Sequence, residues 1–210
     1  MRNEVKEFKR QRLYDLYDVR SNPFLFVTTK IDITNIVNYC KIHKNYYATI
    51  AYFINLAANE MDCFKYRKEE NKIYKYDDLR IQFVQMLNED DIGFFECDPN
   101  TDYKTYIENF KKSQDDFKKT GISSDDEDLG EIWVSCVPWF EFTSLIPPFD
   151  NSMSVPQFIW GKFVEENGKT YTNLMIMIHH GFADGNHIGI FINKLNEKIS
   201  NFDKYIGRMV

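Results

Sequence analysis

The residues best suited to chemistry lie near the end of the chain, where an apolar run stops at His179 and His180 and a short turn leads to Asp184 and Gly185. Imidazole has an unperturbed pKa that lets it accept a proton near neutral pH, so His180 is a candidate general base. A carboxylate held nearby by a tight turn can fix the local structure or orient other groups. A single histidine at a strand end is more often a satisfied core residue, so this pattern alone leaves both interpretations open. Side chains alternate along a strand, and His179 is therefore expected to face the opposite side and to be structural.

Length and composition indicate one folded domain over residues 1–210, with 43% hydrophobic residues and no internal repeat or low-complexity linker. The 18 Phe, 13 Tyr and 3 Trp residues suit a packed core or an apolar ligand pocket. A formal net charge of −6, with acids concentrated at residues 125–128, argues against a nucleic-acid-binding surface.

Cysteine usage and the absence of apolar segments narrow the class of protein further. The four cysteines are widely spaced without a C-x-x-C pair, which predicts reduced thiols and no metal site. The charged N-terminal residues 1–12 contain no apolar signal region, and no run approaches membrane-spanning length. We therefore expect a cytoplasmic protein without a membrane partner.

Hydrophobic periodicity predicts an alternation of helices and strands. Helices are predicted over residues 5–17, 34–41, 47–61, 102–119 and 188–199, and strands over residues 24–31, 72–76, 81–87, 131–137, 157–165 and 169–179. The dipeptide Asn167-Gly168 predicts a hairpin turn, because both residues tolerate positive φ. The acidic stretch 123–130 is interpreted as a solvated connection. This order favours an α/β two-layer sandwich in which helices cover one face of a mixed β-sheet.

A second informative stretch is Ser135-Cys-Val-Pro-Trp-Phe-Glu-Phe-Thr-Ser144. Taken alone, it is equally consistent with a bulged strand that carries a core tryptophan. Together with His-x-x-x-Asp-Gly it resembles the chloramphenicol acetyltransferase family, in which a Pro-Trp and a Phe-Thr-Ser precede the histidine motif. The acyltransferase domains of 2-oxo acid dehydrogenase complexes share the histidine motif but lack this run. Phe8-Lys-Arg10 and Pro156-x-Phe158-x-x-Gly161-Lys162 match in the expected order, so the resemblance spans essentially the whole chain.

The resemblance implies an O-acetyltransferase that uses acetyl-CoA as co-substrate and binds no cofactor of its own. It implies that His180 is the general base, that Ser144 donates a hydrogen bond to the oxyanion, and that Asp184 pairs with Arg10. It also implies a homotrimer whose active sites lie between subunits. The remaining implied contacts are Tyr17, Met86, Phe142 and Ile159 for the acceptor and Lys162 for acetyl-CoA.

The chain departs from the drug-inactivating members at several positions. Ile159 replaces a threonine that holds a water, Met86 replaces a phenylalanine that contacts the drug, and residues 181–183 differ from the usual loop. Three functions therefore stay open: chloramphenicol acetylation, acyl transfer to another hydroxyl compound, and a non-catalytic role. The intact set of His180, Asp184, Ser144 and Arg10 argues against the last.

Overall fold

Strands from both halves of the chain form one mixed sheet in the computed structural model, which describes residues 1–99, 101–121 and 129–207. The strand order is β2 (Phe24–Asp32), β10 (Lys169–His179), β8 (Gln157–Gly161), β7 (Glu131–Val137), β5 (Arg80–Met86) and β6 (Ile92–Cys97), and β9 (Val164–Glu166) also pairs with β10. Strand β7 runs parallel to β5 and β8, whereas the other pairs are antiparallel. The C-terminal end of β10 therefore lies at the edge of the sheet opposite the C-terminal ends of β5, β7 and β8.

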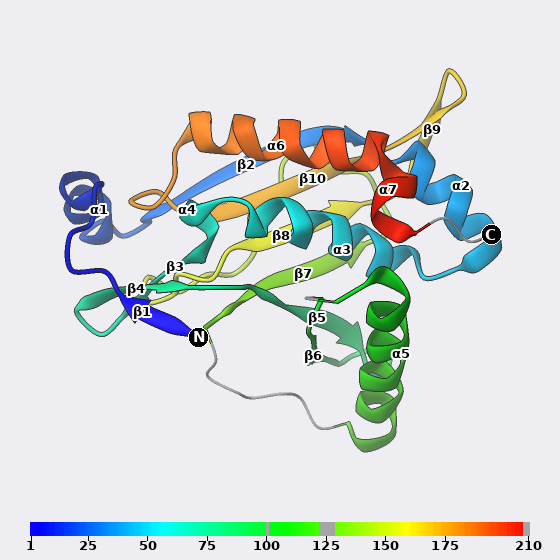
Figure 1. The fold of residues 1–210 in the computed structure, drawn as a ribbon, viewed down its shortest axis with the longest axis horizontal. Helices are drawn as coiled ribbons and strands as arrows, with labels where there is room; N and C mark the ends of the chain where they lie inside the picture. The colour runs from blue at the N-terminus through cyan, green and yellow to red at the C-terminus, as the bar shows by residue number, and fades with distance from the viewer. Residues whose placement is uncertain (100, 122–128, 208–210) are drawn as a thin grey trace.

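Helices cover one face of this sheet, as the sequence predicted (Figure 1). They are α2 (Thr34–His43), α3 (Tyr46–Asn59), α5 (Tyr103–Thr120), α6 (Gly185–Ser200) and α7 (Phe202–Ile206). Alternate strand residues such as Phe83, Phe158 and Ile176 are fully buried against Phe53 of α3 and Phe191 of α6. The predicted α/β architecture, a mixed sheet with helices on one face, is confirmed.

The opposite face of the sheet carries the intervening residues of the same strands. Met175 and Met177 of β10 pack there with Ile159 of β8 and Phe24 of β2. The segment that follows β7 covers this group through Phe142. A loop therefore covers this part of the face, and Phe142, which is one of the predicted site residues, lies in that loop.

The hairpin between β9 and β10 turns where the sequence predicted it. Asn167 and Gly168 have φ values of 51° and 75°, which are the left-handed values that such a turn requires. The predicted acidic connection falls largely on residues 122–128, which lie outside the described residues.

The N-terminal prediction was wrong in extent. Helix α1 spans only Gln11–Asp18. Part of the segment before it forms strand β1 (Arg2–Glu4), which pairs with β4 (Lys72–Tyr76) in a small sheet that also contains β3 (Tyr66–Glu69). The Val5 N–H donates to the carbonyl of Ile73 at 2.8 Å, and Phe8 packs on Tyr14 and Phe182. The short helix α4 (Asp62–Lys65) leads into β3.

The predicted strand 157–165 is also interrupted. It breaks after Gly161, where the Lys162 N–H turns to the carbonyl of Phe140 at 3.0 Å, and it resumes as β9.

Candidate active site

Strand β10 ends at His179 and places His180 at the first position of the following turn. The His180 backbone N–H donates to the carbonyl of Pro23 at 2.8 Å, and its ring Nδ1 lies 2.9 Å from the carbonyl of Ala183. A carbonyl only accepts hydrogen bonds, so Nδ1 carries the ring proton and Nε2 keeps its lone pair. The ring of Tyr17 stacks on the imidazole with centroids 4.0 Å apart and planes 10° apart. His180 therefore has a fixed orientation and tautomer that suit a proton acceptor.

Asp184 closes the same turn and caps helix α6. Its Oδ1 accepts from the backbone N–H groups of Asn186 and His187 at 3.1 and 3.4 Å, and from the His187 Nδ1 at 2.7 Å. Its Oδ2 accepts from the Arg10 Nη1 at 2.9 Å. The His187 hydrogen bond first, and then that of Arg10, hold the pKa of Asp184 well below its usual value against the opposing effect of burial. Asp184 is therefore a carboxylate that anchors the turn.

Arg10 binds three points of this turn from the segment just before α1. Besides the Asp184 carboxylate, its Nε donates to the carbonyl of Gly181 at 3.1 Å and its Nη2 to the carbonyl of His180 at 3.5 Å. The structure thus brings together Arg10, Asp184, His180 and Tyr17, four of the residues predicted from the sequence. One side chain, Arg10, therefore makes both the ion pair and the backbone hydrogen bonds that hold this turn.

Ser144 lies in the loop after β7, away from His180. The carbonyl of Phe142 accepts from Asn173 Nδ2 of β10 at 2.7 Å, and Ser144 follows two residues later as an exposed side chain. Asn173 precedes His180 by seven residues, which is about 23 Å along a strand. Two residues of chain recover at most about 7 Å of that distance. Within one chain, Ser144 therefore lies toward the start of β10, whereas His180 directly follows its end.

The other predicted residues lie at the sheet edge near Ser144 or on the helix-free face of the sheet. The exposed Lys162 follows β8 beside the Ser144 loop, and Met86, which is 42% exposed, ends the parallel strand β5 at the same sheet edge. Phe142 packs with Ile159 on the helix-free face, and the position of a Cβ at Gly161 lies only 3.1 Å from the Phe142 ring.

Comparison with known proteins identifies the family of this chain. The model of the family described as chloramphenicol acetyltransferase matches residues 1–196. The chain belongs to the chloramphenicol acetyltransferase family. Chloramphenicol acetyltransferases from Staphylococcus intermedius and Campylobacter coli are 29% and 25% identical to it, covering 86% and 94% of this chain and 87% and 97% of their own.

Solved structures give the same fold. A chloramphenicol acetyltransferase structure with 22% identity has a TM-score of 0.86 and covers 95% of this chain and 100% of its own. A probable dihydrolipoamide acetyltransferase from Listeria monocytogenes, with 13% identity, has a TM-score of 0.72 and covers 99% of this chain and 96% of its own. The chain is an acyltransferase, as the sequence motifs indicated.

His187 lies beside Asp184 in the candidate site, and sequence reasoning assigned it no role. Its ring reaches back to the residue that caps the helix: Nδ1 donates to Asp184 Oδ1 at 2.7 Å. The available signal was its position three residues after a helix-capping aspartate, where capping boxes place a side chain that reaches back.

The cysteines and the candidate metal ligands are further groups that can take part in chemistry. Burial raises the pKa values of Cys63, Cys97 and Cys136 to about 12, so these thiols are poor nucleophiles. Within residues 1–99, 101–121 and 129–207, no three His, Cys, Asp or Glu side chains gather as candidate metal ligands. No helix in that part of the chain is long and apolar enough to cross a membrane.

Proposed function

We propose that this protein transfers the acetyl group of acetyl-CoA to a hydroxyl of chloramphenicol, with His180 as general base. The observation that carries the proposal is the tautomer of His180, because the hydrogen bond from Nδ1 to Ala183 leaves Nε2 free to accept a proton. The curated relatives named chloramphenicol acetyltransferase support the choice of acceptor.

In the proposed reaction, both substrates are bound together. His180 Nε2 takes the proton of the acceptor hydroxyl while the hydroxyl oxygen attacks the thioester carbon and forms a tetrahedral oxyanion. Ser144 donates its hydroxyl hydrogen to that oxyanion. The intermediate then collapses, the C–S bond breaks, and the CoA sulfur receives the proton from the His180 imidazolium. The products are the acetyl ester and free CoA, and the base is restored without a covalent enzyme intermediate.

We further propose that the complete site forms between two subunits of a homotrimer. The separation of Ser144 from His180 along β10 supports this, because a hydroxyl and a base so far apart cannot serve one carbonyl. Apolar side chains next to Ser144 are also unusually exposed: Trp139, Phe140 and Ile146 are 64%, 52% and 63% exposed. A second copy that covers this loop would bring its own His180 to Ser144, with Lys162 beside acetyl-CoA.

Mixing two inactive variants tests the shared site. His180→Ala and Ser144→Ala subunits should each be nearly inactive alone. After denaturation and refolding together in equal amounts, about a quarter of the sites in a cyclic oligomer would combine an intact His180 with an intact Ser144. Recovery of about a quarter of wild-type activity supports the proposal. No recovery, with mixed oligomers demonstrated by differently tagged subunits, contradicts it.

The acceptor is tested by following release of the CoA thiol from acetyl-CoA with and without chloramphenicol. Drug-dependent release supports chloramphenicol acetylation. Release only with other hydroxyl compounds favours a related acyltransferase, which the apolar substitutions at Met86 and Ile159 permit. No release with any acceptor would indicate a non-catalytic family member and overturn the proposal.

A further inference from the structure

The histidine that precedes the base is fully buried and surrounded by aromatic rings. The His179 ring has 0% exposure, and its centroid lies 5.0 Å from that of Phe182, 5.4 Å from Tyr14 and 5.9 Å from Phe24. Burial lowers its pKa from 6.5 to about 4. His179 is therefore neutral at neutral pH, and its two ring nitrogens have different roles.

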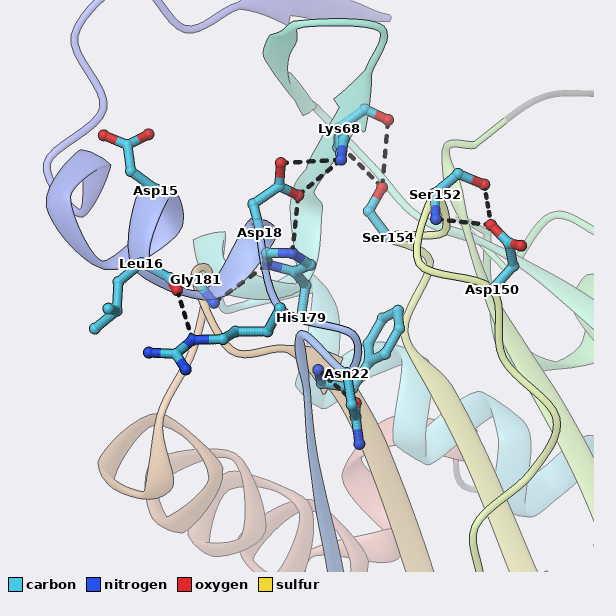
Figure 2. A network of polar contacts seen from close by, with 12 residues as sticks. Asp15, Leu16, Asp18, Asn22, Lys68, Asp150, Ser152, Ser154, His179 and Gly181 are labelled. Atoms are coloured by element: carbon cyan, nitrogen blue, oxygen red, sulfur yellow. Dashed lines mark hydrogen bonds and ion pairs between the residues drawn. The ribbon is translucent and has the colours of Figure 1, made fainter.

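Hydrogen bonding assigns those roles. The backbone N–H of Gly181 donates to His179 Nδ1 at 3.2 Å, so Nδ1 holds a lone pair and Nε2 carries the proton. Nε2 faces the Asp18 carboxylate, with 3.4 Å between Nε2 and Oδ1 (Figure 2). The two adjacent histidines thus have opposite tautomers: His180 is protonated at Nδ1 and His179 at Nε2.

Asp18 is held in place from the other side by Lys68 of β3. The Lys68 Nζ donates to both carboxylate oxygens at 2.8 and 3.0 Å, and Figure 2 shows Asp18 between Lys68 and His179. The 3.4 Å contact to His179 is longer than an ordinary hydrogen bond, so Asp18 acts mainly as a negative charge facing the N–H end of the ring. Asp18 also directly follows Tyr17, whose ring stacks on His180.

These contacts meet at the peptide that follows the base. The C=O of His180 accepts from Arg10, and the N–H of Gly181 in the same planar unit donates to His179. The peptide is thereby held from both sides. A Cβ at Gly181 would lie 2.7 Å from the Cα of Tyr14, so helix α1 packs directly against this peptide.

We propose that His179 and Asp18 are positioning residues for the base, acting through the peptide between His180 and Gly181 and through the Tyr17 ring. This inference rests on the proposed role of His180. His179 accepts the N–H of Gly181, and Asp18, fixed by Lys68, orients His179 and the end of α1. Neither residue touches the reacting atoms.

The first test replaces Asp18, which lies near the surface, so that the variant is expected to fold. Asp18→Asn should lower kcat about tenfold and leave both KM values close to normal, because a displaced base loses its alignment with the bound hydroxyl. The matched control is Asp15→Asn on the same helix, whose carboxylate accepts from Gln11 and points away from the network (Figure 2). Its kcat should stay within about twofold of wild type. A normal kcat in Asp18→Asn would overturn the role of Asp18.

Two replacements of His179 separate positioning from packing. His179→Phe keeps the ring shape but leaves the N–H of Gly181 without its acceptor. His179→Asn is smaller, but its side-chain oxygen can take the place of Nδ1. We expect the Phe variant to be the more stable and the Asn variant to be the more active. If kcat instead follows thermal stability across the two variants, His179 is only a packing residue.

Nitrogen NMR of ¹⁵N-histidine-labelled protein tests the inference without any acceptor substrate. Wild type should show His179 protonated at Nε2 and His180 at Nδ1, and His179→Phe should shift the His180 signals toward mixed tautomers. A wild-type His179 protonated at Nδ1, or unchanged His180 signals in the variant, would contradict the inference. Because this measurement needs no turnover, it distinguishes a failure of the positioning role from a failure of the proposed acetyl transfer.

Discussion

The two ends of strand β10 differ in how completely a single chain prepares them. At the His180 end, the imidazole ring is held by Ala183 and Tyr17, and the turn is anchored by Arg10. At the other end, Ser144 is an exposed residue on a loop, and among the described residues no hydrogen bond involves its side chain. The His180 ring is thus held by several contacts, whereas the Ser144 hydroxyl is exposed to solvent. For the proposed reaction, this means that one chain holds the proposed base in place and leaves the proposed oxyanion donor exposed.

The largest effect on kcat should come from a change at the His180 end of β10. His180→Ala removes the proton acceptor, and a positioned general base contributes about 10²- to 10⁴-fold to the rate. We expect kcat to fall by that amount while acetyl-CoA binding and thermal stability stay close to wild type. Steady-state kinetics and calorimetric titration with acetyl-CoA check this. A variant with nearly normal kcat would remove His180 as the base and with it the comparison between the two ends.

Ser144→Ala tests the proposed oxyanion donor at the other end of β10. If the hydroxyl serves only the oxyanion, kcat should fall about 10²- to 10³-fold with normal KM values, because the interaction forms mainly in the transition state. The melting temperature should not change, since the side chain is exposed and is not needed for folding of the chain. A kcat reduced only a few-fold, or a loss of stability instead, would assign Ser144 a filling role.

The sequence predicted the parts of the site that are local in the chain. The pattern around His180, Asp184 and Gly185 predicted a strand end, a turn and a helix, and all three are present. Alternation along β10 predicted different roles for His179 and His180, and the two rings have different contacts, His179 with Gly181 and His180 with Ala183. These features depend on neighbouring residues, which periodicity and capping rules describe well.

Contacts between distant segments were not predictable from residue patterns, and the Arg10–Asp184 pair was expected only through the family resemblance. No pattern indicates that Asp18 and Lys68 meet beside His179, since the three residues come from α1, β3 and β10. The apolar spacing of Val5 and Phe8 suggested a helix, but these residues serve a sheet edge and an aromatic cluster. Tertiary packing overrode local preference there.

The His180 end of β10 should also make the stability of the protein depend on pH in a distinctive way, through the neighbouring His179. The pKa of His179 falls from 6.5 to about 4 on folding, and the ionisable groups near it are Asp18, Lys68, His180 and Tyr14. Between these pH values the unfolded chain binds a proton that the folded chain does not, so stability is lost as the pH falls from 6.5 to about 4. The full loss is about 3 kcal/mol. Asp184 acts in a lower range, because its depressed pKa keeps its stabilisation until the pH falls below its usual value of 3.8.

Urea unfolding of wild type and His179→Phe across this window measures the effect. The wild-type curve should steepen below pH 6.5, and the variant should lack that component. Parallel curves for the two proteins would show that His179 is not the group responsible.

The smallest expected effect concerns the Arg10–Asp184 ion pair, which anchors the turn at the His180 end of β10. Arg10 and Asp184 are 19% and 37% exposed, so their direct coupling in a double-mutant cycle should be about 1 kcal/mol in unfolding free energy. Asp184→Asn should be the more damaging single change, because it weakens the cap of α6 and the contact with His187 as well. In Arg10→Ala, His187 still holds the carboxylate.

The same cycle measured on kcat sharpens the comparison between the two ends of β10. Arg10 also binds the carbonyls of His180 and Gly181, so its loss should displace the base even where Asp184 keeps its cap. The double variant should therefore lose less activity than the sum of the two single losses, since both residues fix one turn. A matched pair of Arg10→Ala and Ser144→Ala, located at different ends of β10, should be additive. Additive losses for Arg10 and Asp184 would mean that the two residues do not act as one anchor.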